Sequence, residues 1–150
     1  MARIDYFAIE LEIQKVLLQD AILVGAGVVH VVVEEDLVTS PEMCPWIGIY
    51  ISDRESAGGP IAAGTQQRFR VRYEVWCYDH ALDVPEASRL RDEILDKVEV
   101  ALIKKPTLNG KVTSMLITGG TFDSGRTAVG FLQGGSIVLE IEKKATTATT

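Results

Sequence analysis

Residues 66–79 read Gln-Gln-Arg-Phe-Arg-Val-Arg-Tyr-Glu-Val-Trp-Cys-Tyr-Asp, and this stretch decides the fold. Its apolar and polar side chains alternate, which is typical of a β-strand with two different faces. One face carries Phe69, Val71, Tyr73, Val75 and Cys77, and the other carries Arg68, Arg70, Arg72, Glu74, Trp76 and Tyr78. At ~3.3 Å per residue the stretch spans roughly 46 Å, whereas a compact domain of this size is about 40 Å across. We therefore expect the strand to overhang the domain and to leave backbone groups that another copy of the chain pairs with.

An amphipathic helix is predicted near the N-terminus. It begins after Asp5, a residue type that caps the free N–H groups of a first turn, and runs to about Leu18. One apolar stripe comprises Tyr6, Ile9, Ile13, Val16 and Leu17, and a second stripe, about 120° around the helix, comprises Phe7, Leu11 and Leu18. We expect the first stripe to pack on the sheet. Two readings of the second stripe are open: contact with another surface, or burial in the same core.

A second helix is predicted directly after the long strand. Asp83 is its expected N-cap, Pro85 suits the first turn, and Pro106 ends it. The apolar positions that recur at helical spacing predict its buried face: Ala87, Leu90, Ile94, Val98 and Ala101 or Leu102. Charged residues occupy most of the remaining surface, so this helix is expected to meet solvent there.

Shorter strands complete the predicted sheet. They cover Val28–Val33, Trp46–Ser52, Lys111–Thr118, about Thr127–Leu132, and Ser136–Lys143. Asn109-Gly110 is a turn signal that leads into the third of these. The polar stretch Asp53–Thr65, rich in small residues, is expected to form the mobile tip of a hairpin.

The order of these elements predicts the fold class. It is α+β, with a mixed, mainly antiparallel β-sheet, two helices packed on one face and an extended hairpin loop. Residues 1–144 are expected to form a single domain, and residues 145–150 a flexible C-terminal tail.

Composition excludes several classes of protein. The 150 residues are 47% hydrophobic and 24% charged, which is typical of a globular protein and too apolar for a disordered one. No apolar run approaches the ~20 residues that cross a bilayer. The N-terminus also lacks the pattern of a signal peptide, so a cytosolic origin without membrane association is expected. The net charge of −6 argues against tight nucleic-acid binding, which needs clustered Lys and Arg.

No motif predicts catalysis, and neither enzyme activity nor a cofactor is expected. Gly25-Ala26-Gly27 precedes a strand instead of following one and lacks the third glycine of a dinucleotide loop. Gly58–Thr65 lacks the lysine of a phosphate loop. Asp79-His80 with Asp83 could act as an acid–base pair, but capping chemistry at a strand-to-helix turn is the favoured interpretation.

Cys44, Cys77, His30 and His80 are the residues that could bind a metal. No pair has the short spacing that structural zinc sites favour, so no metal is expected. A disulfide is not expected either, because intracellular thiols stay reduced. Cys77 falls on the inward face of the long strand and is expected to pack as a small hydrophobe.

The arginine stripe Arg68, Arg70 and Arg72 is the strongest polar feature. It is a poor nucleic-acid patch, because the background is acidic and no lysines flank it. Glu140 and Glu142 on the last strand are better partners, since opposite charges that face each other across strands stabilise a sheet. Whether such pairs form within one subunit or between two is open, as is a plain solvated face.

The order of elements resembles the tail terminator (tail completion) proteins of long-tailed bacteriophages, including the minor tail protein U type. The stretches that carry the resemblance are Cys44–Tyr50 entering a strand, Phe69–Tyr78 running into the helix Ala87–Ile94, and the closing Gly130–Ile141. The likeness covers roughly Asp5 to Glu142.

The resemblance implies a structural virion protein in the tail or neck, assembled in the host cytoplasm. Such subunits close into a hexameric ring that caps the finished tail tube, ends its polymerisation and joins it to the head connector or stopper. The implied partners are further copies of the chain, the tail tube protein, the connector or stopper, and the tape-measure protein. DNA passes through the lumen without being held.

The candidate subunit or partner interface draws on several elements: Arg54, Arg68, Arg70, Arg72, Trp76, Glu140, Glu142, Phe7, Leu11 and Leu18. Asp53–Thr65 and Gly119–Gly135 are further expected contact surfaces for the tube and the connector. Other readings are a head-completion or stopper subunit, or a baseplate component. A small cytosolic enzyme or ligand-binding domain would need a pocket with converging polar groups, and an adaptor would bind peptides at its sheet edge.

Overall fold

The sheet of this protein has the predicted mixed, mainly antiparallel character. The computed structural model describes residues 5–35, 41–56, 66–127 and 130–146. Within these ranges the strand order is β1-β2-β3-β6-β4, with β5 also paired to β6. The strands are β1 (His30–Val33), β2 (Trp46–Ser56), β3 (Gln66–Ala81), β4 (Ser114–Ile117), β5 (Phe122–Thr127) and β6 (Gly130–Thr146). β1 and β2 are parallel, and the other pairs are antiparallel.

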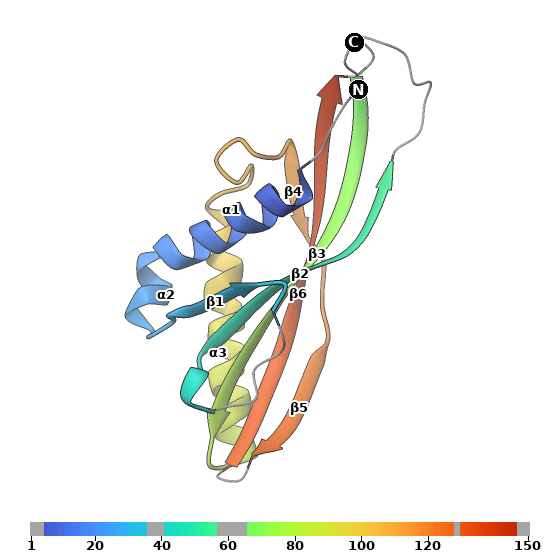
Figure 1. Cartoon of the computed structure of the whole chain (residues 1–150). Helices are drawn as coiled ribbons and strands as arrows, with labels where there is room; N and C mark the ends of the chain where they lie inside the picture. Colours follow the sequence, from blue (N-terminus) through green and yellow to red (C-terminus); the bar gives the residue numbers. More distant parts are fainter. Residues whose placement is uncertain (1–4, 36–40, 57–65, 128–129, 147–150) are drawn as a thin grey trace.

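The long strand is confirmed, but its predicted role as an open edge is wrong. β3 pairs with β6 along its whole length, from Gln66 opposite Thr146 to Ala81 opposite Phe131. On its other side β3 pairs with β2 from Phe69 to Tyr78. The β3–β6 ribbon projects past the helices, as expected from its length (Figure 1). The unpaired border was inferred from the length of this strand, and it is paired because the last strand, β6, predicted only over Ser136–Lys143, is at least as long.

Two strands are longer than predicted. β2 continues to Ser56, so the first part of the predicted Asp53–Thr65 loop is strand, and residues 57–65 lie outside the described ranges. β6 runs without a break from Gly130, where a short strand, a gap and a second strand were expected, and β5 precedes it. The first two residues of the predicted tail also belong to β6, where they pair with Gln66 and Gln67. Residues 147–150 lie outside the described ranges.

Two glycines in β6 explain the missed continuity. A Cβ at Gly134 would lie 2.2 Å from the Tyr78 ring, and one at Gly135 would lie 2.7 Å from the Leu95 side chain. These glycines are therefore sites of close approach within a strand. At the sequence level they resemble the break between two strands.

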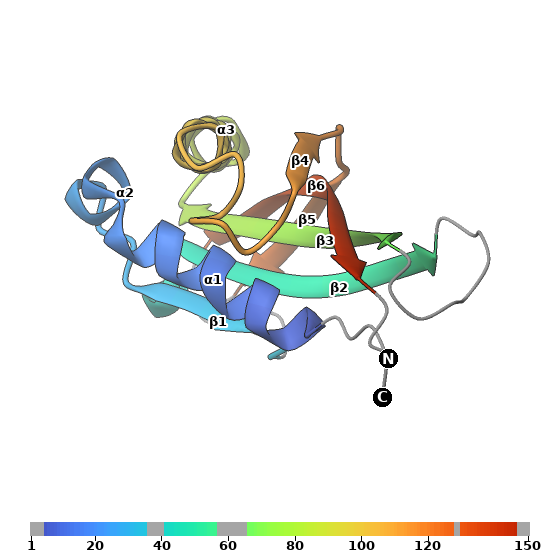
Figure 2. The same ribbon diagram turned by 90° about the horizontal axis from the view of Figure 1, so that it is seen from above.

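Two helices cover one face of this sheet (Figure 2). α1 (Tyr6–Gln19) begins at Asp5, whose carboxylate accepts the Ala8 N–H at 3.0 Å. α3 (Val84–Ile103) begins at Asp83, whose carboxylate accepts the Glu86 N–H at 2.9 Å. Both predicted N-caps are confirmed.

A short helix, α2 (Ala21–Gly25), follows α1 and was not predicted. Asp20 caps it by accepting the N–H groups of Ile22 and Leu23. A five-residue helix is too short to show a hydrophobic period. β1 consequently begins later than the predicted strand Val28–Val33.

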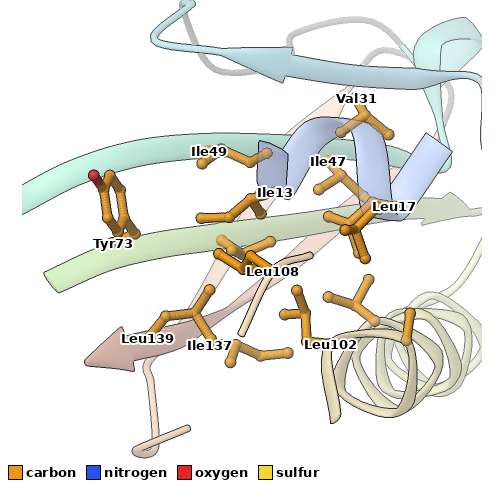
Figure 3. Packing of buried hydrophobic residues seen from close by; sticks show 14 of the residues in the cluster. Ile13, Leu17, Val31, Ile47, Ile49, Tyr73, Leu102, Leu108, Ile137 and Leu139 are labelled. Atoms are coloured by element: carbon orange, nitrogen blue, oxygen red, sulfur yellow. The ribbon is translucent and has the colours of Figure 1, made fainter. Parts of the chain in front are cut away.

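The main core lies between the helices and the sheet (Figure 3). It includes Ile13 and Leu17 of α1, Leu102 of α3, and Tyr73 of β3, all of which have no exposed surface. Ala87, Ile94, Val98 and Ala101 of the predicted α3 face are buried, whereas Leu90 is only half-buried. The Tyr73 hydroxyl donates a hydrogen bond to the Tyr6 carbonyl oxygen at 2.9 Å, which ties α1 to the centre of the sheet.

A second apolar cluster lies on the opposite face of the sheet. Trp46, Tyr78 and Leu132 are its buried members. The Trp46 and Tyr78 rings meet edge to face at 5.8 Å, and Trp76 stacks on Tyr78 at 6.0 Å. The sheet is therefore packed on both faces at this end, although the helices cover only one of them.

No helix in the described ranges combines the length and the hydrophobicity needed to cross a bilayer.

Candidate interaction surfaces

The predicted arginine–glutamate pairs form across β3 and β6 within one chain. The register places Arg70 opposite Glu142 and Arg72 opposite Glu140. The Arg72 Nε lies 2.9 Å from Glu140 Oε1, and Glu142 lies 3.9 Å from both Arg68 and Arg70. The hydrogen bond with Glu140 raises the pKa of the Arg72 guanidinium above its ordinary value. The predicted cross-strand partnership is confirmed, and it is intrasubunit.

β2 contributes a second row of acidic partners that the sequence reasoning missed. Asp53 Oδ2 lies 3.5 Å from Arg72, and Glu55 Oε1 lies 3.7 Å from Arg70. These residues were assigned to a loop, so their place beside β3 could not be anticipated. Residues of β2, β3, β4 and β6 together line a cavity of about 320 Å³. Arg70 and Arg72 have acidic partners on both neighbouring strands. The positive charges that line this cavity are therefore already paired within the chain.

The second stripe of α1 is exposed, which decides between its two readings. Phe7 is 55% exposed, and Leu11 and Leu18 are also exposed. Burial of this stripe in the chain's own core is therefore excluded. Ile22 and Val24 continue the exposed apolar surface on α2. The four-residue spacing from Leu18 to Ile22 was visible in the sequence, but Asp20 and the glycines that follow obscured a second helix.

Arg54 lines the same cavity as Arg70 and Arg72, whereas Trp76 belongs to the aromatic cluster. Arg54 is in β2, and its guanidinium lies 5.7 Å from the centre of the Tyr6 ring of α1. Trp76 is half-buried in the aromatic cluster with Tyr78. The candidate interface thus separates into three surfaces: the Arg–Glu surface of the sheet, the α1 stripe, and the aromatic cluster.

A pair of carboxyl groups that was not predicted links buried Glu10 of α1 to exposed Glu34, which follows β1. Glu10 is buried, and within the described ranges its Oε2 has no hydrogen-bond partner. Burial, together with the hydrogen bond and charge of Glu34, raises the pKa of Glu10 to about 8. Glu34 is itself held in place, since its Oε1 accepts the Ile51 N–H at 2.6 Å. An acidic residue in a helix is normally read as solvent-facing, so no sequence signal separated Glu10 from its neighbours.

The candidate metal ligands do not form a cluster. In residues 5–35, 41–56, 66–127 and 130–146 no group of three or more His, Cys, Asp or Glu side chains could hold an ion. Cys44 and Cys77 are both free thiols. Cys77 is fully buried in the main core, as predicted, and burial raises the pKa of its thiol. Asp83 serves as the cap of α3, and Asp79 accepts the His80 N–H at 2.8 Å.

Comparison with known proteins gives a likeness in structure and none in sequence. No protein-family model matches the chain, and no curated protein matches it. Among solved structures, it is similar to a chain in the virion of a native gene transfer agent (GTA) particle, with a TM-score of 0.48 and 8% sequence identity. The match covers 91% of this chain and 93% of that chain.

Proposed function

We propose that this chain is a structural virion protein of a tailed, phage-like particle. In this proposal its copies close into a hexameric ring at the neck, cap the tail tube, end its polymerisation and join it to the head connector or stopper. The ring assembles in the host cytoplasm, and DNA passes through its lumen. The subunit has no catalytic role.

The exposed apolar stripe of α1 is the observation that carries the proposal. A helix that only had to cover its own sheet would place polar residues on its outer face. Exposed contiguous apolar surface on a small protein marks a site of contact with another molecule. The resemblance in order of elements to tail terminator proteins supports a virion joint as the setting for that contact.

Other features of the subunit fit the same role. The β3–β6 ribbon projects past the helices and presents a long, narrow surface (Figure 1). In the described ranges β4 and β5 each pair only with β6, so their outer edges are available to partners. The net charge of −6 favours a lumen along which DNA slides, because a basic lining would bind the phosphates.

Assembly in the presence of tail tubes tests the proposal. Mass photometry of the purified chain, followed by electron microscopy of the chain mixed with tubes of its own particle, should show hexameric rings at tube ends and an end to tube growth. Rings that bind the connector and never the tube would instead indicate a stopper or head-completion subunit. A chain that stays monomeric and binds neither would contradict the proposal.

The Arg–Glu surface remains a predicted interface. In an Arg70→Glu variant the new carboxylate lies opposite Glu142 and beside Glu55, so the surface becomes strongly acidic. Ring formation should weaken while the circular dichroism spectrum of the subunit is retained. Assembly equal to that of the original chain would show that this surface faces solvent in the ring.

A further inference from the structure

We propose that the α1 stripe of one copy of the chain docks against Phe122 of the next copy, so that neighbouring subunits meet head to tail. The inference rests on the proposed function, because it names the two surfaces through which such a ring would close. Both surfaces are exposed and apolar in the single subunit, and they lie at opposite borders of the sheet.

The first surface is short of charge. Within α1 the exposed residues are Phe7, Leu11, Lys15, Leu18 and Gln19. Lys15 is the only charged residue among them. With Ile22 and Val24, the apolar members expose roughly 400 Å² of side chain, the size of the largest apolar patch on a typical monomer.

The second surface is a single aromatic side chain held in position. Phe122 begins β5 and is 70% exposed. The Arg91 guanidinium of α3 lies 4.3 Å from the centre of its ring, and the Arg91 side chain is itself only 13% exposed. Aromatic residues and arginine are enriched in the cores of protein interfaces, and this position combines both.

The positions of the two surfaces favour a second copy of the chain as the occupant. α1 packs over β1 and β2 at one border of the sheet, and β5 lies at the other (Figures 1 and 2). A two-fold contact between α1 helices would leave Phe122 uncovered in both copies. A head-to-tail contact covers both surfaces at once, and repetition of that contact generates a ring.

The area of the contact agrees with this arrangement. A stable interface buries about 800 Å² on each partner. The α1–α2 apolar surface supplies roughly half of that on one side, as the core of a larger contact. A polar rim is available from Lys15 and Gln19 on that side and, on the other, from Asp92, which pairs with the Arg91 that lies over Phe122.

Disulfide trapping distinguishes the possible contacts. In a Cys44→Ser background, Leu11→Cys and Phe122→Cys are made in separate chains, which are then mixed and oxidised with buried Cys77 retained. Mixed dimers of the two chains are expected, and neither variant alone should form more than traces of dimer. Dimers of Leu11→Cys with itself would establish a two-fold α1 contact and overturn the proposal.

Charge substitutions provide an independent measurement. Leu11→Glu and Phe122→Glu should each raise the Kd of self-association about tenfold or more, because each buries a charge in an apolar contact. Val100→Glu on the exposed face of α3 is the matched control and should leave that Kd unchanged. Retained thermal melting by circular dichroism verifies the fold of all three variants.

The outcomes separate this inference from the proposed function. Hexameric rings that form normally from Leu11→Glu and Phe122→Glu chains, or that give no mixed disulfide, overturn the contact but leave the ring intact. Absence of rings from the original chain, alone and on tail tubes, overturns both.

Discussion

α1 and α3 are built alike on one side and differently on the other. Each begins at an aspartate cap and buries an apolar stripe against the same face of the sheet. The outer face of α3 is charged, and Arg89 pairs there with Glu86 and Glu93. The outer face of α1 is apolar. The buried faces follow from the needs of folding, whereas folding alone gives no reason for the exposed apolar residues of α1.

Truncation of the buried stripes should have the largest effect, and an equal one on both helices. Leu17→Ala in α1 and Leu102→Ala in α3 each leave a cavity in the same core, since both side chains are fully buried. Each should lower the free energy of unfolding by about 3 kcal/mol, measured by urea denaturation. A loss below about 1 kcal/mol at one of them would show that the two buried faces are not equivalent.

Titration of Glu10 should make α1 sensitive to pH. The pKa of Glu10 in the folded chain is about 8, above the ordinary 4.5, so the folded state holds a proton that the unfolded state releases. Stability is therefore greatest below pH 4.5 and is lost as the pH rises through 8. Glu10→Gln keeps a donor for Glu34 and should remove this loss, so that its advantage over the original chain grows between pH 6 and pH 8 by about 2 kcal/mol.

The control for this prediction lies on the same helix. Glu12 is also buried and accepts a hydrogen bond from Asn109 Nδ2 at 2.8 Å. Because Glu12→Gln retains Glu10, its free energy of unfolding should keep the downward slope with pH. If the free energy of unfolding of the unsubstituted chain were equal at pH 5 and pH 9, the raised pKa of Glu10 would be contradicted.

Removal of the caps should have a smaller effect, again equal on the two helices. Asp5→Ala and Asp83→Ala each free one backbone N–H at the start of a helix. We expect each to lower the free energy of unfolding by about 1 kcal/mol in denaturant titrations followed by circular dichroism. Asn at either position should restore most of the loss, which separates capping from other effects of the substitution.

Substitutions on the outer faces of the two helices should have the smallest effect on stability and the clearest difference in their effect on self-association. Leu18 of α1 and Val100 of α3 are 39% and 38% exposed. Replacing either by Gln should change the free energy of unfolding by about 0.5 kcal/mol or less. Self-association, measured by analytical ultracentrifugation, should weaken for Leu18→Gln alone. Equal association of the two variants would remove the distinction between the outer faces.

The parts of the fold that were predictable depend on local pattern. The caps Asp5 and Asp83, the stripes of α1 and the two faces of β3 follow from short-range periodicity, and the structure contains all of them. The pairing of Arg72 with Glu140 was also predictable, because the two outward faces carry opposite charges.

The missed parts depend on neighbours that are distant in sequence. Gly134 and Gly135 were read as a break because nothing local reveals that Tyr78 and Leu95 approach them. Asp53 and Glu55 were placed in a loop because their partners, Arg72 and Arg70, lie on another strand. The open edge was assigned to β3 because of its length, since the full extent of its partner β6 could not be inferred from local pattern.

The aromatic cluster behind the sheet also determines what intrinsic fluorescence can report. The chain has two tryptophans, and both Trp46 and Trp76 belong to that cluster, on the face opposite α1. Their emission therefore reports whether the sheet is folded, and it does not respond to a partner that binds α1. The tryptophan emission spectrum should shift on denaturation and stay constant on ring closure. Unfolding and assembly can then be distinguished in the same sample without an added label.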